Sequence, residues 1–279
     1  MKNRLFQAIL MIIISAPLII SCGKLPVSPS HTDWDAVKEI IFENPEIFSL
    51  GFYNTTPDTP FYREITESHP DIDDGKLIKA DSIHWVDRIT LTWSDWLYGN
   101  FHYYLDGKSY EKPCSSYTST NAYFERWGNA SDPHRGWFLK KISGTNMGNP
   151  GSPPLIYGLS ILPEGSDTTI DITNLLSLVR PDSTLIFKRG KQVTFTIHIF
   201  PSESLAFVSL FVKEGKDYQK IPLTSIEKYT KSASWITTND PEIAKGYHHA
   251  IVDAVTYESV ADTTSKFHYM AWGIIYRIE

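Results

Sequence analysis

The sequence predicts an α+β domain, with helices first and an antiparallel meander after them, followed by an all-β domain built as a sandwich. Apolar residues first recur with a helical period, and from residue 82 onward they alternate with polar residues, as in half-buried strands. A stretch rich in Pro, Gly and Asn at 145–154 lies between two such regions. We therefore expect domains at 32–144 and 155–279, joined by a linker at 145–154.

The first 22 residues resemble the signal of a bacterial lipoprotein. A short basic start precedes an apolar run at 5–20. This run is short for a membrane-spanning helix, which needs about 20 apolar residues, and its length suits the apolar region of a signal peptide. The run ends in a sequence similar to the lipobox, a branched apolar residue and a small residue before a cysteine: Ile19-Ile20-Ser21-Cys22. The resemblance implies that residues 1–21 are a signal peptide and that Cys22 is acylated.

Acylation of Cys22 would make the membrane the first partner of the protein, because each buried CH₂ of an acyl chain contributes roughly 0.8 kcal/mol. Gly23 follows the cysteine in place of the Asp that usually marks retention in the inner membrane, which favours the outer membrane where the host has two. Residues 22–31 are rich in Pro and Ser and suit an extended tether. We expect a lipid-anchored protein of the bacterial cell envelope.

The mature chain is acidic. The full chain has a formal charge of −6, and removal of the signal takes away Lys2 and Arg4 but no acidic residue, which leaves −8. This charge argues against nucleic acid as a partner. With Cys22 acylated, Cys114 has no second cysteine in the chain to pair with, so no disulfide is expected.

The first domain is expected to begin with helices. A helix starts at Thr32 or Asp33 and ends at Asn44-Pro45, where Pro suits the first position of a second short helix. Residues 61–66 are expected to form another short helix, and residues 68–76 a polar, acidic loop.

Strands are expected from residue 82. One face of the first strand is expected to carry Ile83, Trp85, Ile89, Leu91 and Trp93. Two residue pairs of the kind found in hairpin turns follow, Gly99-Asn100 and Asp106-Gly107.

This order of helices, Asn-Pro break and strands ends in a Trp-x-Leu pattern at Trp137-Phe138-Leu139, and over 32–144 it resembles the NTF2-like, cystatin-like superfamily. The resemblance implies helices packed on a curved antiparallel sheet that forms a cone with a pocket. Some members of that superfamily are isomerases or dehydratases that use a pocket Asp or His, and many are not enzymes.

Short strands separated by turns follow the linker, and we expect a β-sandwich at 155–279. A clean alternation places Val193, Phe195, Ile197 and Ile199 on one face of a strand. The arrangement is similar to immunoglobulin-like domains. The inter-sheet disulfide of those domains is absent, and His249 stands where the second cysteine would follow Tyr247.

Candidate site residues come from the polar and aromatic residues of the first domain. Asp87, Asp95 and His102 are the candidates for a catalytic acid or base, since burial against aromatic rings shifts the pKa of such groups. The candidates for ligand binding are Trp93, Tyr103 and Trp127. The alternative is that most of these aromatic residues fill the core between sheet and helices.

No metal site and no cofactor are predicted. The acidic loop Asp71, Asp73, Asp74 has Gly75 where a calcium-binding loop needs an oxygen ligand, and adjacent His248 and His249 would point to opposite faces of a strand. The sequence also lacks a nucleophile elbow, a phosphate loop, a Cys-x-x-Cys motif and a dinucleotide fingerprint.

The sequence therefore favours a non-enzymatic lipoprotein that binds a protein, glycan or small ligand, or that serves as an accessory subunit. One alternative is a hydrolase or isomerase that uses an Asp or His in the pocket of the first domain. A second alternative is a structural spacer. An open pocket or a contiguous exposed aromatic patch would favour binding, and a pocket filled by its own side chains would favour the spacer.

Overall fold

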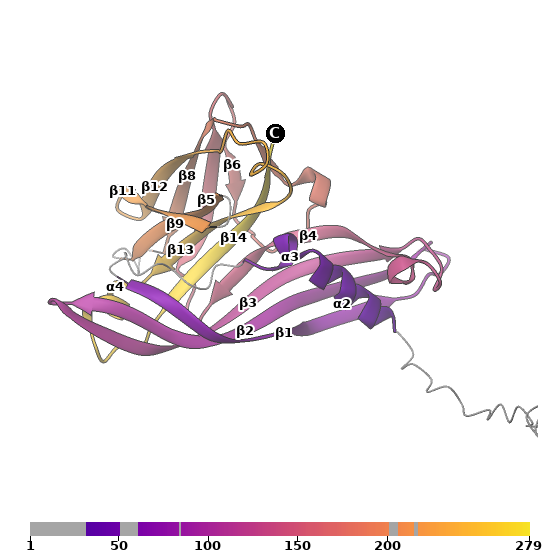
Figure 1. Ribbon diagram of the computed structural model, residues 1–279, viewed down its shortest axis with the longest axis horizontal. Helices are drawn as coiled ribbons and strands as arrows, with labels where there is room; N and C mark the ends of the chain where they lie inside the picture. The colour runs from indigo at the N-terminus through magenta and orange to yellow at the C-terminus, as the bar shows by residue number, and fades with distance from the viewer. Residues whose placement is uncertain (1–31, 51–60, 84, 201–205, 215–216) are drawn as a thin grey trace, which may run out of the picture. The chain divides into compact units, whose positions relative to one another are not determined.

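The computed structural model describes residues 32–50, 61–83, 85–200, 206–214 and 217–279 (Figure 1). Cys22, the signal segment 1–21 and the tether at 22–31 lie outside the described residues. Asp33–Glu279 forms one compact unit, and β-strands make up most of it. The β-rich character expected from the alternating pattern is confirmed.

The helices of the described residues are short. They are α2 (Asp33–Glu43), α3 (Pro45–Phe48) and α4 (Tyr257–Ala261), with 3₁₀ turns η1 (Pro133–Gly136) and η2 (Pro181–Ser183). The expected helix at the start of the unit is confirmed, with Val37, Ile40 and Ile41 buried on one side. Its end also follows the prediction, since Asn44 donates a hydrogen bond to the Ile40 carbonyl over 2.6 Å and Pro45 starts α3.

Most strands belong to one sheet, called sheet A here. Its order is β1-β2-β3-β4-β14-β13-β9-β10, antiparallel throughout, and β7 pairs with β14 in parallel. The strands are β1 (Phe61–Ile78), β2 (Asp87–Leu105), β3 (Lys108–Arg126), β4 (Trp137–Gly148), β7 (Leu185–Phe187), β9 (Phe207–Glu214), β10 (Asp217–Pro222), β13 (His248–Val255) and β14 (Tyr269–Ile278).

A second antiparallel sheet, sheet B, has the order β11-β12-β8-β5-β6. Its strands are β5 (Ile156–Pro163), β6 (Ile170–Ile172), β8 (Gln192–Ile199), β11 (Thr224–Glu227) and β12 (Thr230–Ile236).

Strand β4 extends to Gly148, within the segment expected to be a linker at 145–154. Thr145–Gly148 pairs with Met270–Gly273 of β14, near the end of the chain. Sheet A therefore contains strands from both sides of that segment.

The expected turn at Asp106-Gly107 is confirmed. Both residues have positive φ, 50° and 76°, and they join β2 to β3 as a two-residue hairpin loop. The expected turn at Gly99-Asn100 is wrong, because both residues lie inside β2. A Cβ at Gly99 would lie 1.9 Å from the Glu64 carbonyl oxygen of β1, so this glycine allows a close approach of two strands.

The expected fold class, with an NTF2-like α+β domain of helices packed on a sheet at 32–144, is wrong. Residues 61–66 and 68–76, expected to be a helix and a loop, both lie in the 18-residue strand β1. Their polar residues tolerate this conformation because β1 pairs along its length with β2, and two bulges absorb the irregular pattern. Pairing over a long distance therefore overrides the local pattern.

Sheet A is curved, since residues from β1 and β2 pack in one buried cluster with residues from β9, β13 and β14. That cluster includes Phe61, Leu97, Phe101, Phe211, Ile251 and Tyr269. Helices α2 and α3 cover another part of the same sheet, where they pack on β2, β3 and β4. Strand β13 lies near the centre, and its residues are buried along its whole length.

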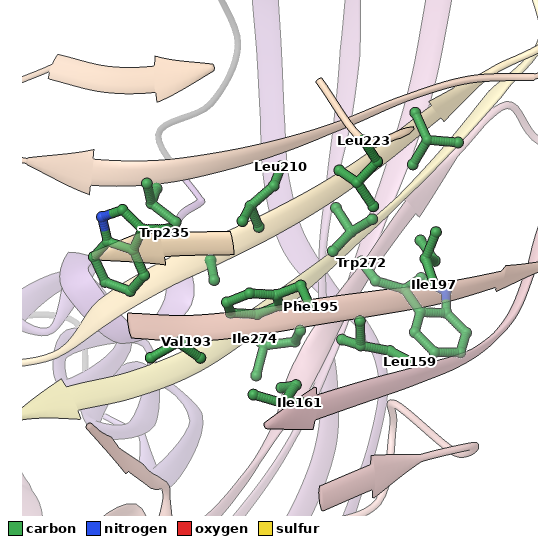
Figure 2. Close-up of a cluster of buried hydrophobic side chains, with 14 of the residues drawn as sticks. Leu159, Ile161, Val193, Phe195, Ile197, Leu210, Leu223, Trp235, Trp272 and Ile274 are labelled. Atoms are coloured by element: carbon green, nitrogen blue, oxygen red, sulfur yellow. The ribbon is translucent and has the colours of Figure 1, made fainter. Parts of the chain in front are cut away.

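Sheet B packs against the β9, β13 and β14 part of sheet A, and a large apolar cluster fills the space between them (Figure 2). Phe195 and Ile197 of β8 point into this cluster together with Leu210 of β9 and Ile274 of β14. The alternation expected for β8 is confirmed, because Val193, Phe195, Ile197 and Ile199 are all buried. This arrangement is compatible with the expected sandwich.

Candidate functional site: a cavity where sheet A divides

Strand β14 changes its neighbour halfway along one edge. Its first half pairs with β4, up to Gly273, and its end pairs with β7, from Tyr276. Between these stretches Ile274 and Ile275 pair with β13 on the other edge but with neither β4 nor β7. Sheet A therefore divides at Ile274 and Ile275.

The segment 173–184, which connects β6 to β7, borders this division and is called the crossing segment here. Its backbone bonds to β4: Ile142 and Val179 exchange two N–H···O bonds of 2.8 and 2.9 Å, and the Gly144 N–H donates to Leu175 O over 3.1 Å. The crossing segment thus takes the place beside β4 that β14 has left.

Glycine at position 144 is needed for this approach. A Cβ there would lie 2.4 Å from Cδ1 of Leu175 and 2.7 Å from the carbonyl oxygen of Gly273. A larger residue would force the Leu175 side chain or the Gly273 carbonyl to shift.

A cavity of about 340 Å³ lies at the division, between the crossing segment and sheet A. This volume is within the range of small-molecule sites, about 300–1,000 Å³. Its apolar walls are made by Ile170, Ile172, Leu175, Val179, Leu185, Ile274 and Ile275. Its polar groups are hydroxyls, an amide and one carboxylate, from Ser143, Thr173, Asn174, Ser177, Ser183, Thr184 and Asp171.

The buried polar groups of this cavity already have partners that hold them in place. The Ser143 hydroxyl accepts a bond from the Asn121 N–H over 2.8 Å and donates to the Gly144 carbonyl over 2.6 Å. The Thr184 hydroxyl donates to the Pro181 carbonyl over 2.9 Å. These hydroxyls keep acceptor lone pairs that a ligand can use.

The lining does not favour acid–base or nucleophilic catalysis. Among the described residues that line the cavity, Asp171 is the one charged side chain, and its Oδ1 accepts a bond of 2.6 Å from the half-buried Ser160 hydroxyl. A catalytic serine would need an adjacent base such as His, and the lining described here contains none. The apolar walls and fixed hydroxyls of this cavity suit the binding of a ligand.

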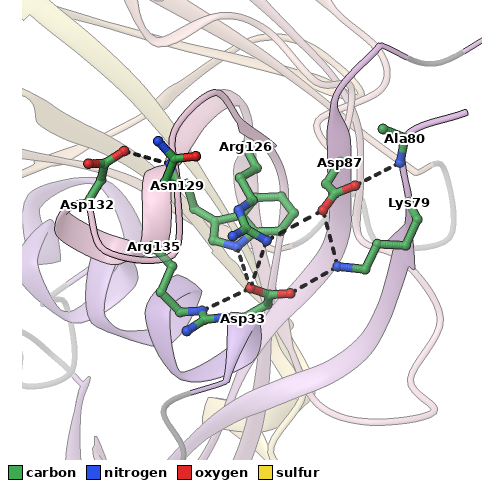
Figure 3. A network of polar contacts seen from close by, with 9 residues as sticks. Asp33, Lys79, Ala80, Asp87, Arg126, Asn129, Asp132 and Arg135 are labelled. Atoms are coloured by element: carbon green, nitrogen blue, oxygen red, sulfur yellow. Dashed lines mark hydrogen bonds and ion pairs between the residues drawn. The ribbon is translucent and has the colours of Figure 1, made fainter.

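Asp87, one of the expected catalytic candidates, lies in a network of ion pairs near the N-terminus of α2 (Figure 3). Its carboxylate contacts Lys79 at 3.2 Å and Arg126 at 3.6 Å and accepts a bond from the Ala80 N–H. Burial alone would raise the pKa of Asp87, but the bond from Ala80 and the charge of Lys79 lower it.

Asp33 is the second carboxylate of this network. It contacts Lys79 at 3.2 Å, Arg126 at 3.5 Å and Arg135 at 3.1 Å, and it accepts a bond from the indole N–H of Trp137. Partial burial would raise the pKa of Asp33, but the bonds from Trp137, Arg135 and Lys79 lower it to about 2. The network ties the first residue of α2 to β2, β3 and η1, which is a structural role.

Asp95 and Trp93 are brought together by the fold. Both are buried on β2, and both line a second cavity of about 210 Å³ under α2 and α3. The two residues were expected in a pocket of the first domain on different grounds, Asp95 as an acid or base and Trp93 as a ligand contact. The structure places them on the same wall.

His102, Tyr103 and Trp127 lie in three other environments. His102 stacks on Tyr62 at 4.5 Å between ring centroids, and its Nε2 lies 3.2 Å from Glu64. Tyr103 is buried in the apolar cluster beside Phe101. Trp127 is 64 % exposed and donates a bond of 2.9 Å to Glu125. None of the three lines either cavity.

The cavity at the division of sheet A was missed by the sequence reasoning. The crossing segment shows no strand or helix period, so its sequence predicts no site there. Its one signal is a group of apolar residues inside a polar loop, Leu175, Leu176, Leu178 and Val179. Apolar residues in such a loop indicate that it packs against something, but they do not identify the partner.

Among the described residues, no group of three or more His, Cys, Asp or Glu side chains is placed so that it could hold a metal ion.

None of the helices in the described part of the chain is both long and apolar enough to cross a membrane.

Comparisons of the chain with protein-family models, with curated proteins and with solved structures find no match.

Proposed function

We propose that this protein is a lipid-anchored binding protein of the bacterial cell envelope, which holds a small, uncharged and mainly apolar ligand in the cavity where sheet A divides. The observation that carries the proposal is the 340 Å³ cavity itself, formed where β14 exchanges β4 for β7. Pockets of this size that combine apolar walls with a few fixed polar groups are the usual form of small-molecule sites.

The lining defines the class of ligand. Isoleucine and leucine side chains from β6, β7, β14 and the crossing segment would contact an apolar body. The hydroxyls of Ser143 and Thr184 can accept hydrogen bonds from a hydroxyl or amide N–H of the ligand. A charged group on the ligand would lack a counter-ion apart from Asp171, whose exposed carboxylate is already bonded to Ser160.

The proposed anchor rests on the sequence alone. The lipobox at residues 19–22 supports acylation of Cys22, and Gly23 supports an outer-membrane location. A protein or glycan partner and an immunoglobulin-like relationship of the C-terminal strands stay predictions.

Filling the mouth of the cavity tests the proposal. Val179 lines the cavity and is 43 % exposed, and its bonds to Ile142 are made by the backbone, so Val179→Trp adds bulk without removing a bond. Ile186 on β7 has nearly the same exposure, 44 %, and is not part of the lining, so Ile186→Trp is the matched control.

Both variants are made in the chain that starts at Gly23, so that neither an acyl chain, the apolar run 5–20 nor detergent competes for the probe, and are titrated with the neutral dye N-phenylnaphthylamine. We expect Val179→Trp to weaken dye binding by at least about tenfold, or 1.4 kcal/mol, and Ile186→Trp to leave it unchanged. Equal dye affinity in the two variants would contradict the proposal.

A further inference from the structure

Four large apolar side chains at one end of sheet A are exposed to water. They are Ile83 (76 %), Trp85 (90 %), Trp127 (64 %) and Phe138 (52 %), and the first two are the most exposed large apolar side chains of the described residues. We call these four residues the apolar end. Single exposed apolar side chains are common on folded proteins, but a group of them at one place marks an interaction site.

The pairing of the strands brings these residues together. The first residue of β2 pairs with the last residue of β3, so Trp85, just before β2, and Trp127, just after β3, lie beyond the same pair. Phe138 of β4 pairs with Glu125, and the indole N–H of Trp127 donates a bond of 2.9 Å to the same glutamate. The turns from β1 to β2 and from β3 to β4 therefore form the apolar end.

The opposite end of the same strands has a different chemistry. There the turn from β2 to β3 exposes Asp106, Gly107 and Lys108. Small and polar residues of this kind are usual in turns, because they suit the backbone conformation and face water. The side chains of the apolar end serve no such turn geometry, and none of them belongs to an apolar cluster of the described core.

The described chain begins at the apolar end. Asp33 contacts Lys79, just after β1, at 3.2 Å and Arg126, at the end of β3, at 3.5 Å (Figure 3). Asp33 is the eleventh residue after Cys22. Since an extended chain spans at most about 3.6 Å per residue, an acyl anchor on Cys22 would hold this end of the sheet within about 40 Å of the bilayer. The strand β2 alone is about 60 Å long, so the opposite end can lie much further away.

The apolar end also matches the chemistry of a membrane interface. Tryptophan is enriched at the level of the lipid headgroups, where its ring is buried and its N–H meets polar groups. Lys140 and Lys141 follow Phe138 on β4, and Nζ of Lys140 lies 5.5 Å from the centre of the Trp127 ring. Among the described residues neither lysine forms an ion pair with a carboxylate. Long lysine side chains can therefore reach lipid phosphates from this position.

We propose that the apolar end is a membrane-binding surface: its four side chains enter the headgroup region of the bilayer that carries the anchor, and Lys140 and Lys141 contact the phosphates. The inference rests on the proposed lipid anchor and is separate from the proposed ligand cavity, because none of these residues lines that cavity. A tethered surface meets the bilayer at a high effective concentration, so weak contacts are sufficient.

The first experiment measures contact between tryptophan and lipid in the acylated full chain. The chain is reconstituted into vesicles of phosphatidylethanolamine and phosphatidylglycerol in which part of the lipid carries bromine on its acyl chains, because bromine quenches tryptophan fluorescence at close range. We expect the brominated lipid to quench the fluorescence of the chain. We expect Trp85→Phe to lower that quenching at least about twofold, since Trp85 is the more exposed tryptophan of the apolar end.

Trp96→Phe is the matched control. Trp96 is a partly exposed tryptophan in the middle of β2, where it packs edge to face on Tyr117, 5.0 Å between ring centroids. Its replacement should leave the quenching unchanged. A chain that brominated lipid does not quench would overturn the proposal, as would equal quenching in Trp85→Phe and Trp96→Phe.

The second experiment places a charge at the apolar end. Ile83→Asp is expected to lower the quenching at least about twofold, because a carboxylate is costly to bring into the interface. Ile236→Asp on β12 of sheet B is the control, since Ile236 is also well exposed, and it should leave the quenching unchanged. Both side chains lie outside the apolar clusters, so neither change disturbs the core. Equal quenching in the two variants would contradict the proposal.

Separate readouts distinguish this inference from the proposed function. Palmitate labelling of Cys22 reports on the anchor, and dye binding to the chain that starts at Gly23 reports on the cavity. A labelled chain with unquenched tryptophan would refute the membrane-binding surface alone, and an unlabelled chain would refute the anchor and this surface with it. If Trp85 is shielded from acrylamide but not quenched by brominated lipid, a protein partner covers the apolar end, and the proposal is overturned.

Discussion

Arg63 and Asp253 form a bidentate ion pair in the interior of curved sheet A, although 190 residues separate them in the chain. The guanidinium of Arg63 on β1 lies 3.1 and 2.8 Å from the carboxylate oxygens of Asp253 on β13, and 4.4 Å from the centre of the Tyr269 ring. Arg63 is 3 % and Asp253 2 % exposed. Because both side chains are buried away from water, each charge is stabilised mainly by the other. The pair therefore joins edge strand β1 to the interior strand β13.

Removing one partner of this pair is expected to destabilise the protein strongly. Asp253→Asn leaves the Arg63 charge buried without its counter-ion, which costs about 3–5 kcal/mol in the free energy of unfolding. The double variant Arg63→Met with Asp253→Leu removes both charges and should recover most of that loss. Urea denaturation measures the free energy of unfolding of each variant. A double variant whose loss of stability equals the sum of the two single losses would contradict the expected result.

His249 is a second buried ionisable residue on β13. Burial lowers its pKa to about 4, against an ordinary value of 6.5, while a hydrogen bond with the backbone of Ile47 acts in the opposite direction. His248 is buried as well, on the opposite face, where it stacks on Tyr276. Both histidine side chains are therefore packed inside the protein, and neither lies at the surface.

The free energy of unfolding is expected to fall between pH 6.5 and pH 4 because of His249. In this window the unfolded chain binds a proton at His249 and the folded chain does not, so each proton favours unfolding. The full effect is about 3 kcal/mol.

The measurement is urea denaturation as a function of pH in His249→Gln and in the exposed control His69→Gln. His249→Gln should show a shallower loss than the unchanged chain, and His69→Gln should show the same loss. A His249→Gln chain with an unchanged slope would contradict the assignment.

Among the elements, the crossing segment 173–184 packs closely on β4 at Gly144. It lies beside β4 where β14 has left, and the absence of a side chain at Gly144 leaves room for Leu175. The cavity proposed as the binding site exists because this segment stays near the division and does not fill it.

Gly144→Ala is expected to displace the crossing segment and to lower the free energy of unfolding by about 1–3 kcal/mol, since the added Cβ overlaps Leu175 and the backbone of Gly273. Gly158→Ala on β5 is the control, because its Cβ would meet His198 at an ordinary 3.4 Å. Hydrogen exchange of the residue 144 amide, bonded to Leu175 O, should speed up in the first variant. Unchanged exchange there would contradict the assigned contact.

Local patterns predicted some elements well and others badly. The helix at Asp33–Glu43, the strand Gln192–Ile199 and the turn at Asp106-Gly107 have periods or residue pairs that report directly on their own conformation. Strand β1 has no such period, and its conformation comes from pairing with β2. Trp93 and Asp95 stay predictions as site residues, and no local pattern indicates the cavity at the division of sheet A.

At the scale of the whole molecule, the proposed lipid anchor precedes the described unit. Residues 1–31 lie outside the described residues, and Asp33, the first residue of α2, is held by the network of Arg126, Arg135 and Lys79. A pull on the tether would therefore act first on a residue with several ionic contacts.

Cys22→Ser is expected to abolish acylation, because the thiol that would carry the acyl chain is replaced by a hydroxyl. The measurement is metabolic labelling with palmitate together with partition into a detergent phase. Cys114→Ser is the matched control, since Cys114 is the other cysteine of the chain and is buried in the apolar cluster. Label that persists in Cys22→Ser would contradict the proposed anchor.

Patterns among neighbouring residues predict the helix at Asp33–Glu43, the alternating strand Gln192–Ile199 and the tight hairpin at Asp106-Gly107, and all three are found in the fold. Which strands pair follows from the folded chain alone. Strand β14, close to the end of the chain, pairs with β4 and β7, and Asp253 meets Arg63 across the sheet. The physical reason is that hydrogen bonding between strands and burial of side chains depend on segments far apart in the chain, whose spacing leaves no local pattern. Both cavities arise from such contacts.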